Sequence, residues 1–171
     1  MNTKLNWGEP FWLSKARSYI GEHEIAGRKH NPLILQWWIK IRAPFTDDET
    51  PWCAAFVGGV LESIGIKSSR SAAARSYLKW GTRLAKPAVG CIAVLWRLTP
   101  SSSTGHVGFV VGKDKSNNLL ILGGNQGNMV NIKHFPTRRV LSYRWPIGLH
   151  SKIDYTLPTL STSGSFSKNE S

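Results

Sequence analysis

Apolar positions in the first half of the chain recur at the spacing of amphipathic helices. Asn31-Pro32 and Thr50-Pro51 each combine a capping side chain with a proline, which is typical of a helix start. Pro10 is suited to the first turn of an earlier helix, and Gly65 to the end of a later one. The pattern predicts helices over residues 10–21, 31–41, 50–64 and 71–80.

Apolar residues in the second half form short runs that are separated by clusters rich in Gly, Ser and Asn. The runs predict β-strands over residues 91–96, 106–112, 119–123, 129–133 and 140–145. Because the helices precede the strands instead of alternating with them, we expect an α+β fold with an antiparallel sheet. The chain of 171 residues suits a single domain over residues 1–155. Residues 156–171 are rich in Ser and Thr and are predicted to be a disordered tail.

The charge balance indicates an anionic partner, because 22 basic and 10 acidic residues give a net charge of +12. Nucleic acid, anionic lipid and bacterial cell wall all fit that charge. The basic residues form no long run or dense stripe, so we expect no nucleic acid as partner. No apolar run approaches the roughly 20 residues that a membrane span requires. The first residues also contain no apolar run long enough for the core of a signal peptide. Synthesis in the cytoplasm is therefore expected.

Cys53 is the first candidate for chemistry, because it falls in the first turn of the helix that Thr50-Pro51 opens. The positive end of a helix dipole favours a thiolate, which is the reactive form of cysteine. Backbone N–H groups at the same place can hold an oxyanion. We predict that Cys53 is a nucleophile, and the alternative is a small buried apolar residue. A disulfide to Cys91, which is predicted to be a buried strand residue, would silence it.

A nucleophilic cysteine needs a base, and His106 is the best placed of the five histidines. It opens an apolar run directly after a polar turn, so it can face a cleft while the rest of the strand lies in the core. The small neighbours Gly105 and Gly108 let a substrate or a helix approach closely. The alternative is an ordinary solvated or core histidine.

The residue that orients the imidazole is expected in the glycine- and asparagine-rich tract over residues 123–128. A hairpin turn centred between residues 115 and 116 would place Asn125 opposite His106, where its amide oxygen can accept the imidazole N–H. A turn centred elsewhere would move that partner to Gly127 or Asn128. The tract also fits a plain turn without any role in chemistry.

Three adjacent acidic residues, at positions 47–49, precede the candidate nucleophile. Carboxylates suit calcium, but three neighbouring acids lack the fuller ligand spacing of a calcium loop. We expect a solvated loop there, and neither a metal ion nor an organic cofactor.

Two motifs resemble those of CHAP and NlpC/P60-type cysteine peptidases. Residues 51–57, PWCAAFV, are similar to their nucleophile motif, and residues 105–112, GHVGFVVG, to their histidine strand. The likeness extends to a CHAP-like subgroup that is common in phage lysis genes and bacterial toxins, through residues 16–32, 122–126 and 143–146. One departure is Gly90-Cys91-Ile92, where the family often has Gly-Asp-Ile.

The resemblance implies a papain-like α+β fold, with N-terminal helices packed on a C-terminal antiparallel sheet. It also implies hydrolysis of amide bonds in bacterial peptidoglycan through a thioester acyl-enzyme. In that mechanism Cys53 is the nucleophile, His106 the base and Asn125 the orienting residue.

The same resemblance predicts a monomeric phage endolysin or exported lytic toxin that acts on the cell wall. Its further partners would be a holin, a secretion system or an immunity protein. Three other functions remain open from the sequence: an inactive wall-binding module, a basic nucleic-acid-binding protein, and a cysteine enzyme that acts on another amide or thioester.

Overall fold

The computed structural model describes residues 8–149 and 153–161. Three α-helices come first, and they are α1 (Phe11–Arg17), α2 (Pro32–Lys40) and α3 (Cys53–Ser63). After them come η1 (Ala74–Lys79), β1 (Thr82–Leu84), β2 (Ile92–Trp96), β3 (Gly105–Lys113), β4 (Leu119–Gly123), β5 (Asn131–Phe135), η2 (Thr137–Arg139) and β6 (Val140–Trp145). All strand pairs are antiparallel. The predicted α+β class is therefore confirmed.

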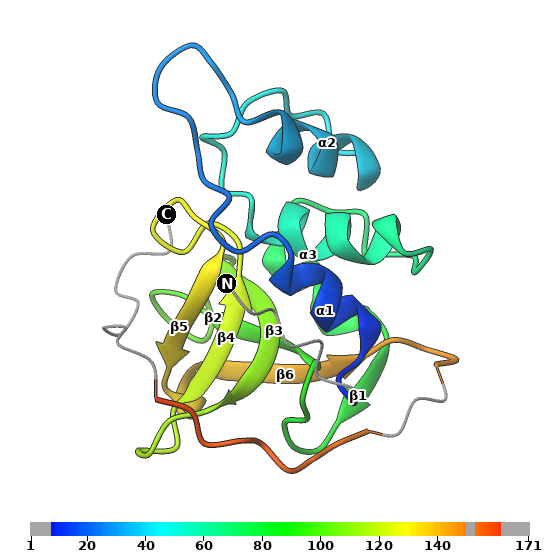
Figure 1. The fold of residues 1–171 in the computed structure, drawn as a ribbon, viewed down its shortest axis with the longest axis vertical. Coiled ribbons are helices and arrows are strands. Elements are labelled where there is room, and N and C mark those ends of the chain that lie inside the picture. The colour runs from blue at the N-terminus through cyan, green and yellow to red at the C-terminus, as the bar shows by residue number, and fades with distance from the viewer. Residues whose placement is uncertain (1–7, 150–152, 162–171) are drawn as a thin grey trace.

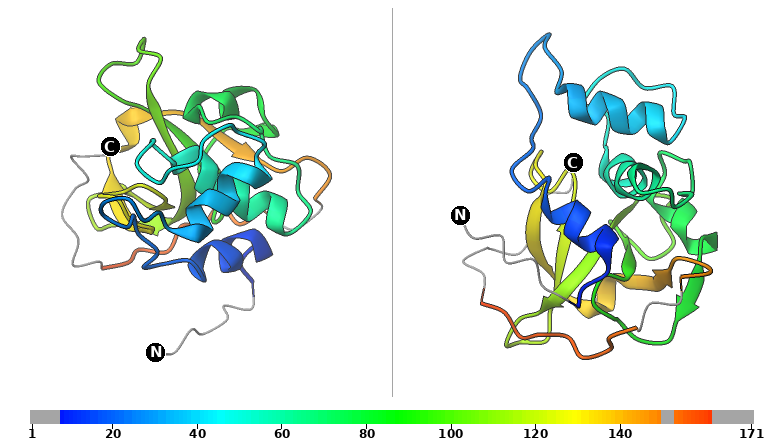
Figure 2. Two further views of the ribbon diagram at one scale, coloured as in Figure 1. Left: turned by 90° about the horizontal axis from the view of Figure 1, so that it is seen from above. Right: turned by 45° about the vertical axis from the view of Figure 1, so that its right-hand side comes forward.

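The strands form one sheet in the order β1-β6-β2-β3-β4-β5, so that β3 has a neighbour on each side. Helix α3 packs on β3 and β4, and α2 packs on α3. Figure 1 shows the resulting layers, with α2 on the side of α3 that faces away from the sheet. The two further views in Figure 2 show the same layering. Helix α3 is thus the central element between the outer helix and the sheet.

The sequence of α3 explains this central position, because residues 53–61 are all buried. A helix that is apolar on every side must be covered on every side. Two glycines on the helix make room for the outer helix and its neighbours. A Cβ atom at Gly59 would lie 2.5 Å from Cγ of Trp37, and one at Gly58 would clash with Ile41. Helix α2 can therefore approach α3 closely only because these two positions have no side chain.

Several element boundaries differ from the predictions. The fourth helix is a 3₁₀ helix, η1, and β1 and η2 were not expected from the pattern. Strand β1 has three residues, two of them exposed, so it shows no apolar alternation. None of the helices in the described ranges is long and apolar enough to cross a bilayer.

The segment of residues 153–161 is an extended strap that passes across the end of β3 (Figure 1). The amide of Lys113 donates to the carbonyl of Pro158 (2.9 Å), and the amide of Leu160 donates to the carbonyl of Lys113 (2.8 Å). Leu157 and Leu160 pack against the core. The structure therefore differs from the predicted disordered tail at residues 156–161, whereas residues 162–171 lie outside the described part of the chain.

We expect Gly59→Ala to destabilise the fold by about 1–3 kcal/mol, because the added methyl group overpacks the contact with Trp37. Helix propensity alone predicts the opposite sign, because alanine stabilises a helix relative to glycine. Thermal unfolding measures the effect, with Gln36→Ala on the exposed side of α2 as the control. If Gly59→Ala unfolds at the same temperature as the wild type, the contact between α2 and α3 can accommodate a methyl group and the prediction is wrong.

Candidate active site

The turn before α3 is closed by Asp47. Its Oδ1 atom accepts hydrogen bonds from the amides of Thr50 (2.6 Å) and Glu49 (3.0 Å). The hydrogen bond from the Thr50 amide is the main reason why the pKa of Asp47 lies below its usual value. The predicted cap at Thr50 is therefore wrong. Trp52 occupies the N-cap position, without a side-chain hydrogen bond, and the helix begins at Cys53.

Asp48 is fully buried and joins this turn to the segment before α2. It accepts hydrogen bonds from the amides of Ile25 (2.8 Å) and Asn31 (2.9 Å) and pairs with Nδ1 of His30 (2.9 Å). Burial acts to raise the pKa of Asp48, but these contacts outweigh it and hold the pKa below its ordinary value. The expectation of a solvated loop is thus wrong at Asp48, whose carboxylate fixes the position of the helix start.

No three His, Cys, Asp or Glu side chains gather as a metal site within residues 8–149 and 153–161. The carboxylates of Asp47 and Asp48 are engaged with backbone N–H groups of this chain. Their observed role is to shape the chain before Cys53.

Cys53 is the first residue of α3 and its side chain is largely buried. Both cysteines of the chain are reduced, so no bridge to Cys91 silences Cys53. Burial raises the pKa of Cys91 to about 12, and its Sγ atom accepts a long contact of 3.5 Å from the amide of Ala88. The two thiols therefore lie in different surroundings: Cys53 at the positive end of a helix, and Cys91 in the core.

The loop after β4 lies directly on the start of α3. A Cβ atom at Gly124 would be 2.5 Å from Cβ of Phe56 and 2.7 Å from Cζ3 of Trp52. These two residues flank the first turn of α3, which contains Cys53. Any side chain at Gly124 would therefore push the loop away from the candidate nucleophile.

The same loop reaches His106, near the start of β3. The His106 side chain is almost fully buried, and its Nε2 atom is hydrogen-bonded to Oε1 of Gln126 (2.9 Å). A Cβ atom at Gly123 would lie 3.1 Å from the same imidazole nitrogen. Residues 123–126 thus contact the first turn of α3 on one side and His106 on the other.

The amide of Gln126 is oriented by its own hydrogen bonds. Its Nε2 group donates to the carbonyl (2.8 Å) and to Oδ1 (3.0 Å) of Asn131. Because the NH₂ group is used there, the oxygen faces His106 and requires a proton on the imidazole Nε2. In the neutral ring Nδ1 is then the basic nitrogen. The fixed amide therefore selects one tautomer of His106.

A second contact holds the plane of the imidazole. The ring of Phe135 stacks on His106, with centroids 5.3 Å apart and planes inclined by 14°. The guanidinium of Arg139 lies over the Phe135 ring, 5.5 Å from its centroid, and donates a hydrogen bond to the carbonyl of Trp96. The base candidate is thus fixed by a hydrogen bond at its edge and by an aromatic ring at its face.

Asn125 lies next to this network but departs from the expected geometry. Strands β3 and β4 pair Phe109 with Leu122, the register that would place Asn125 opposite His106 if β4 continued. Strand β4 ends at Gly123, however, and Asn125 has a left-handed backbone with φ of 57°. The Nε2 atom of His106 is instead hydrogen-bonded to Gln126. The sequence pattern predicts the partner of His106 within residues 123–128, but it does not identify Gln126. An orienting role for Asn125 stays a prediction.

The comparison with known families agrees with this arrangement. The family model of the CHAP domain matches residues 45–125, a range that contains Cys53, His106 and Asn125 and stops one residue before Gln126. The match confirms the CHAP-like resemblance and supports the general class of peptidoglycan hydrolases. Among curated proteins, none matches the chain.

The contrast between the two cysteines predicts selective alkylation. Iodoacetamide near neutral pH should modify Cys53 and leave Cys91 unmodified in the folded protein, because the reactive form is the thiolate. Peptide mass spectrometry locates the label, and a sample unfolded in denaturant provides full labelling of both. His106→Ala should slow labelling of Cys53. Equal labelling of Cys91 and Cys53 in the folded protein would contradict the assignment.

Proposed function

We propose that this protein hydrolyses amide bonds of bacterial peptidoglycan, with Cys53 as nucleophile and His106 as general base. The observation that carries the proposal is the hydrogen bond from His106 to Gln126, which leaves Nδ1 as the basic nitrogen. The loop that supplies Gln126 also packs on the first turn of α3. The match to the CHAP family supports peptidoglycan as the substrate.

The first chemical step is acylation of the thiol. Nδ1 of His106 takes the proton from Cys53, and the sulfur attacks a peptide carbonyl in a stem or cross-bridge. The resulting oxyanion is held by backbone N–H groups at the start of α3, where the helix leaves such groups without helical partners. The hydrogen bond to Gln126 keeps the imidazole in place when it becomes positively charged.

The second step releases the products. The tetrahedral intermediate collapses, the C–N bond breaks, and the imidazolium of His106 gives its proton to the leaving amine. A water molecule then attacks the thioester while Nδ1 accepts its proton. The Cys53 thiolate leaves as the new carboxyl terminus forms, and the imidazolium of His106 returns its proton to the sulfur, so that both residues are back in their starting states. Apart from this water molecule, the steps balance with the groups of the chain and its substrate.

The decisive test is mass spectrometry of purified peptidoglycan after treatment with wild type or with Cys53→Ala. Wild type should generate paired new amine and carboxyl termini, and their position identifies the bond as a sugar–peptide amide or a stem-peptide bond. Cys53→Ala should generate neither. Fragments in both samples would exclude the thioester mechanism, and unchanged wall with both would favour a binding module. A product carrying a transferred acyl group would indicate an acyltransferase.

The identity of the orienting residue follows from two variants. We expect Gln126→Ala to lower kcat roughly tenfold to a hundredfold with little change in KM. The substitution removes the hydrogen bond that holds the proton on Nε2 and keeps Nδ1 as the basic nitrogen. Gln126→Glu keeps an acceptor oxygen and should retain more activity than Gln126→Ala. Kinetics on a soluble muropeptide provide the measurement, with Asn125→Ala as the comparison. A larger loss for Asn125→Ala than for Gln126→Ala would transfer the role to Asn125.

The biological setting is proposed at a coarser level, as phage lysis or delivery of a toxin. A phage endolysin needs a holin to reach the wall, whereas a toxin needs a secretion system and an immunity protein. Expression in the presence and absence of each partner distinguishes these settings.

A further inference from the structure

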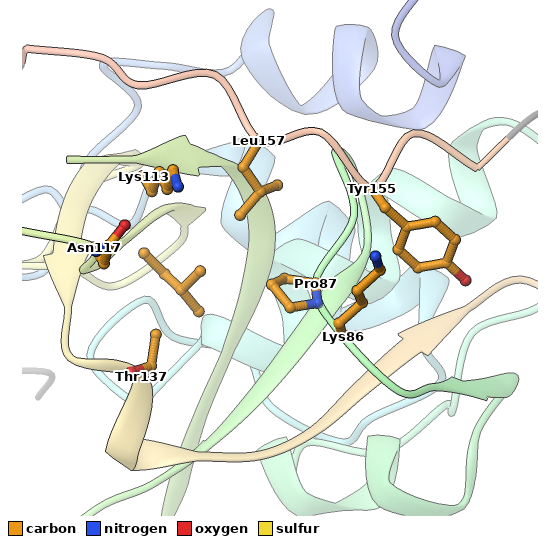
Figure 3. Close-up of a pocket in the computed structure, with 8 residues that line it drawn as sticks. Lys86, Pro87, Lys113, Asn117, Thr137, Tyr155 and Leu157 are labelled. Carbon is orange, nitrogen blue, oxygen red and sulfur yellow. The ribbon is translucent and has the colours of Figure 1, made fainter. Parts of the chain in front are cut away.

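A hollow of about 230 Å³ lies at the end of β3 opposite to His106. It is formed by β3, the turn after it, the start of β4, η2, the segment before β2 and the strap of residues 153–161 (Figure 3). The lining residues are Lys86, Pro87, Lys113, Asn117, Leu119, Thr137, Tyr155 and Leu157. None of the steps proposed for Cys53 and His106 uses this place.

The strap is held so that it forms one wall of this hollow. The amide of Val89 donates to the carbonyl of Asp154 (2.9 Å), and Lys113 exchanges two backbone hydrogen bonds with residues 158 and 160. A Cβ atom at Gly112 would lie 2.6 Å from the carbonyl oxygen of Pro158, so the strap approaches β3 because that position is a glycine. Tyr155 and Leu157 are thereby fixed at the wall.

The lining is positively charged and rich in hydrogen-bonding groups. Lys86 lies on the side of Tyr155, with its Nζ atom 5.0 Å from the ring centroid, and Lys113 lies on the other side next to Asn117 (Figure 3). None of the residues that line the hollow is acidic. Two lysines and an asparagine therefore line one space, with the ring of Tyr155 beside Lys86 at its edge.

The neighbouring carboxylate of Asp114 is turned to other partners. Its Oδ1 atom accepts hydrogen bonds from the amides of Ser116 and Asn118, and its Oδ2 atom contacts Nδ1 of His134 (2.8 Å). The side-chain amide of Asn118 donates a further hydrogen bond to Oδ2 (2.9 Å), and this contact is the main reason why the pKa of Asp114 falls to about 2. Asp114 thus stays ionised, but both of its oxygens are hydrogen-bonded to residues outside the hollow's lining. The charged side chains that line the hollow are those of Lys86 and Lys113.

We infer that this hollow is a second binding site, which takes an anionic group of a cell-wall polymer and holds the enzyme on its insoluble substrate. The inference rests on the proposed function, because that function makes the wall the partner. The anion is either a carboxylate of peptidoglycan itself or a phosphate of a polymer attached to it. Lysine ammonium groups bind either one as point charges.

A lipid surface fits the hollow less well than a polymer. The apolar lining residues are Pro87, Leu119 and Leu157, and none of them is exposed. No large apolar side chain of the lining projects outward for insertion except Tyr155, whose ring is covered on one side by Lys86. A chain that carries its charges on a polar backbone can reach the ammonium groups without such insertion.

The test is retention on insoluble walls in the Cys53→Ala background, where binding is measured without turnover. The double variant Lys86→Gln/Lys113→Gln should bind roughly threefold to tenfold more weakly at low salt, and high salt should reduce the difference. Lys40→Gln/Lys79→Gln removes the same charge from exposed helical positions and is the matched control. The pair Lys86→Arg/Lys113→Arg keeps the charge and should retain binding. Thermal unfolding of each variant checks that it is folded.

Two wall preparations identify the source of the anion. A loss of retention on walls with and without their phosphate polymers assigns peptidoglycan carboxylates, and a loss confined to phosphate-bearing walls assigns the phosphate. Both outcomes support the site. Retention no weaker than that of the control pair overturns it, as does an effect seen with vesicles of anionic lipid and with neither wall. Because the retention assay requires no cleavage, failure of the proposed hydrolysis would be seen separately, as unchanged wall with the wild-type protein.

Discussion

The candidate site depends on the close approach of one loop to one helix. Gly124 lies against Trp52 and Phe56, at the start of α3, and Gly123 lies beside the imidazole of His106. Neither glycine is needed for an unusual backbone angle, since both have φ outside the left-handed region. What matters is the volume that a side chain would take. The absence of two Cβ atoms lets the helix, the loop and β3 meet at a single point.

The residues around His106 restrict the imidazole in complementary ways. Gln126 fixes which nitrogen carries the proton, and Phe135 fixes the plane of the ring. Asn131 in turn fixes the amide of Gln126. A neutral amide orients the ring without adding a buried negative charge, which would need compensation in surroundings that lie almost out of reach of water. The arrangement is therefore consistent with a base whose orientation is set before any substrate is present.

The sequence predicted the elements well and the loop contacts poorly. The start of α2 at Asn31-Pro32 follows from local pattern, whereas α3 begins at Cys53 instead of at the predicted Thr50 cap. The pairing of Phe109 with Leu122 matches the expected register. Next to the turn, Lys113 pairs with Leu119, so the turn is centred on Ser116 and the pairing there is offset by one residue from the expected register; the bulge between Val110 and Gly112 absorbs this offset. Gln126 could not be predicted, because the left-handed backbone at Asn125 ends the alternation of strand faces on which such pairing rests. The roles of the site residues stay predictions.

The position of Cys91 has a consequence for oxidative damage. Ile92, the next residue, pairs with Phe109, whereas His106 pairs with Leu95, so Cys91 lies roughly 13 Å along the strand from the level of the imidazole. It is also sealed in the core as a protonated thiol. The one other cysteine of the chain is therefore unsuited to resolve a sulfenic acid formed on Cys53, because its thiol is buried and protonated. Reduction of such a sulfenic acid depends on small thiols from solution, and further oxidation of Cys53 to the sulfinic acid is irreversible.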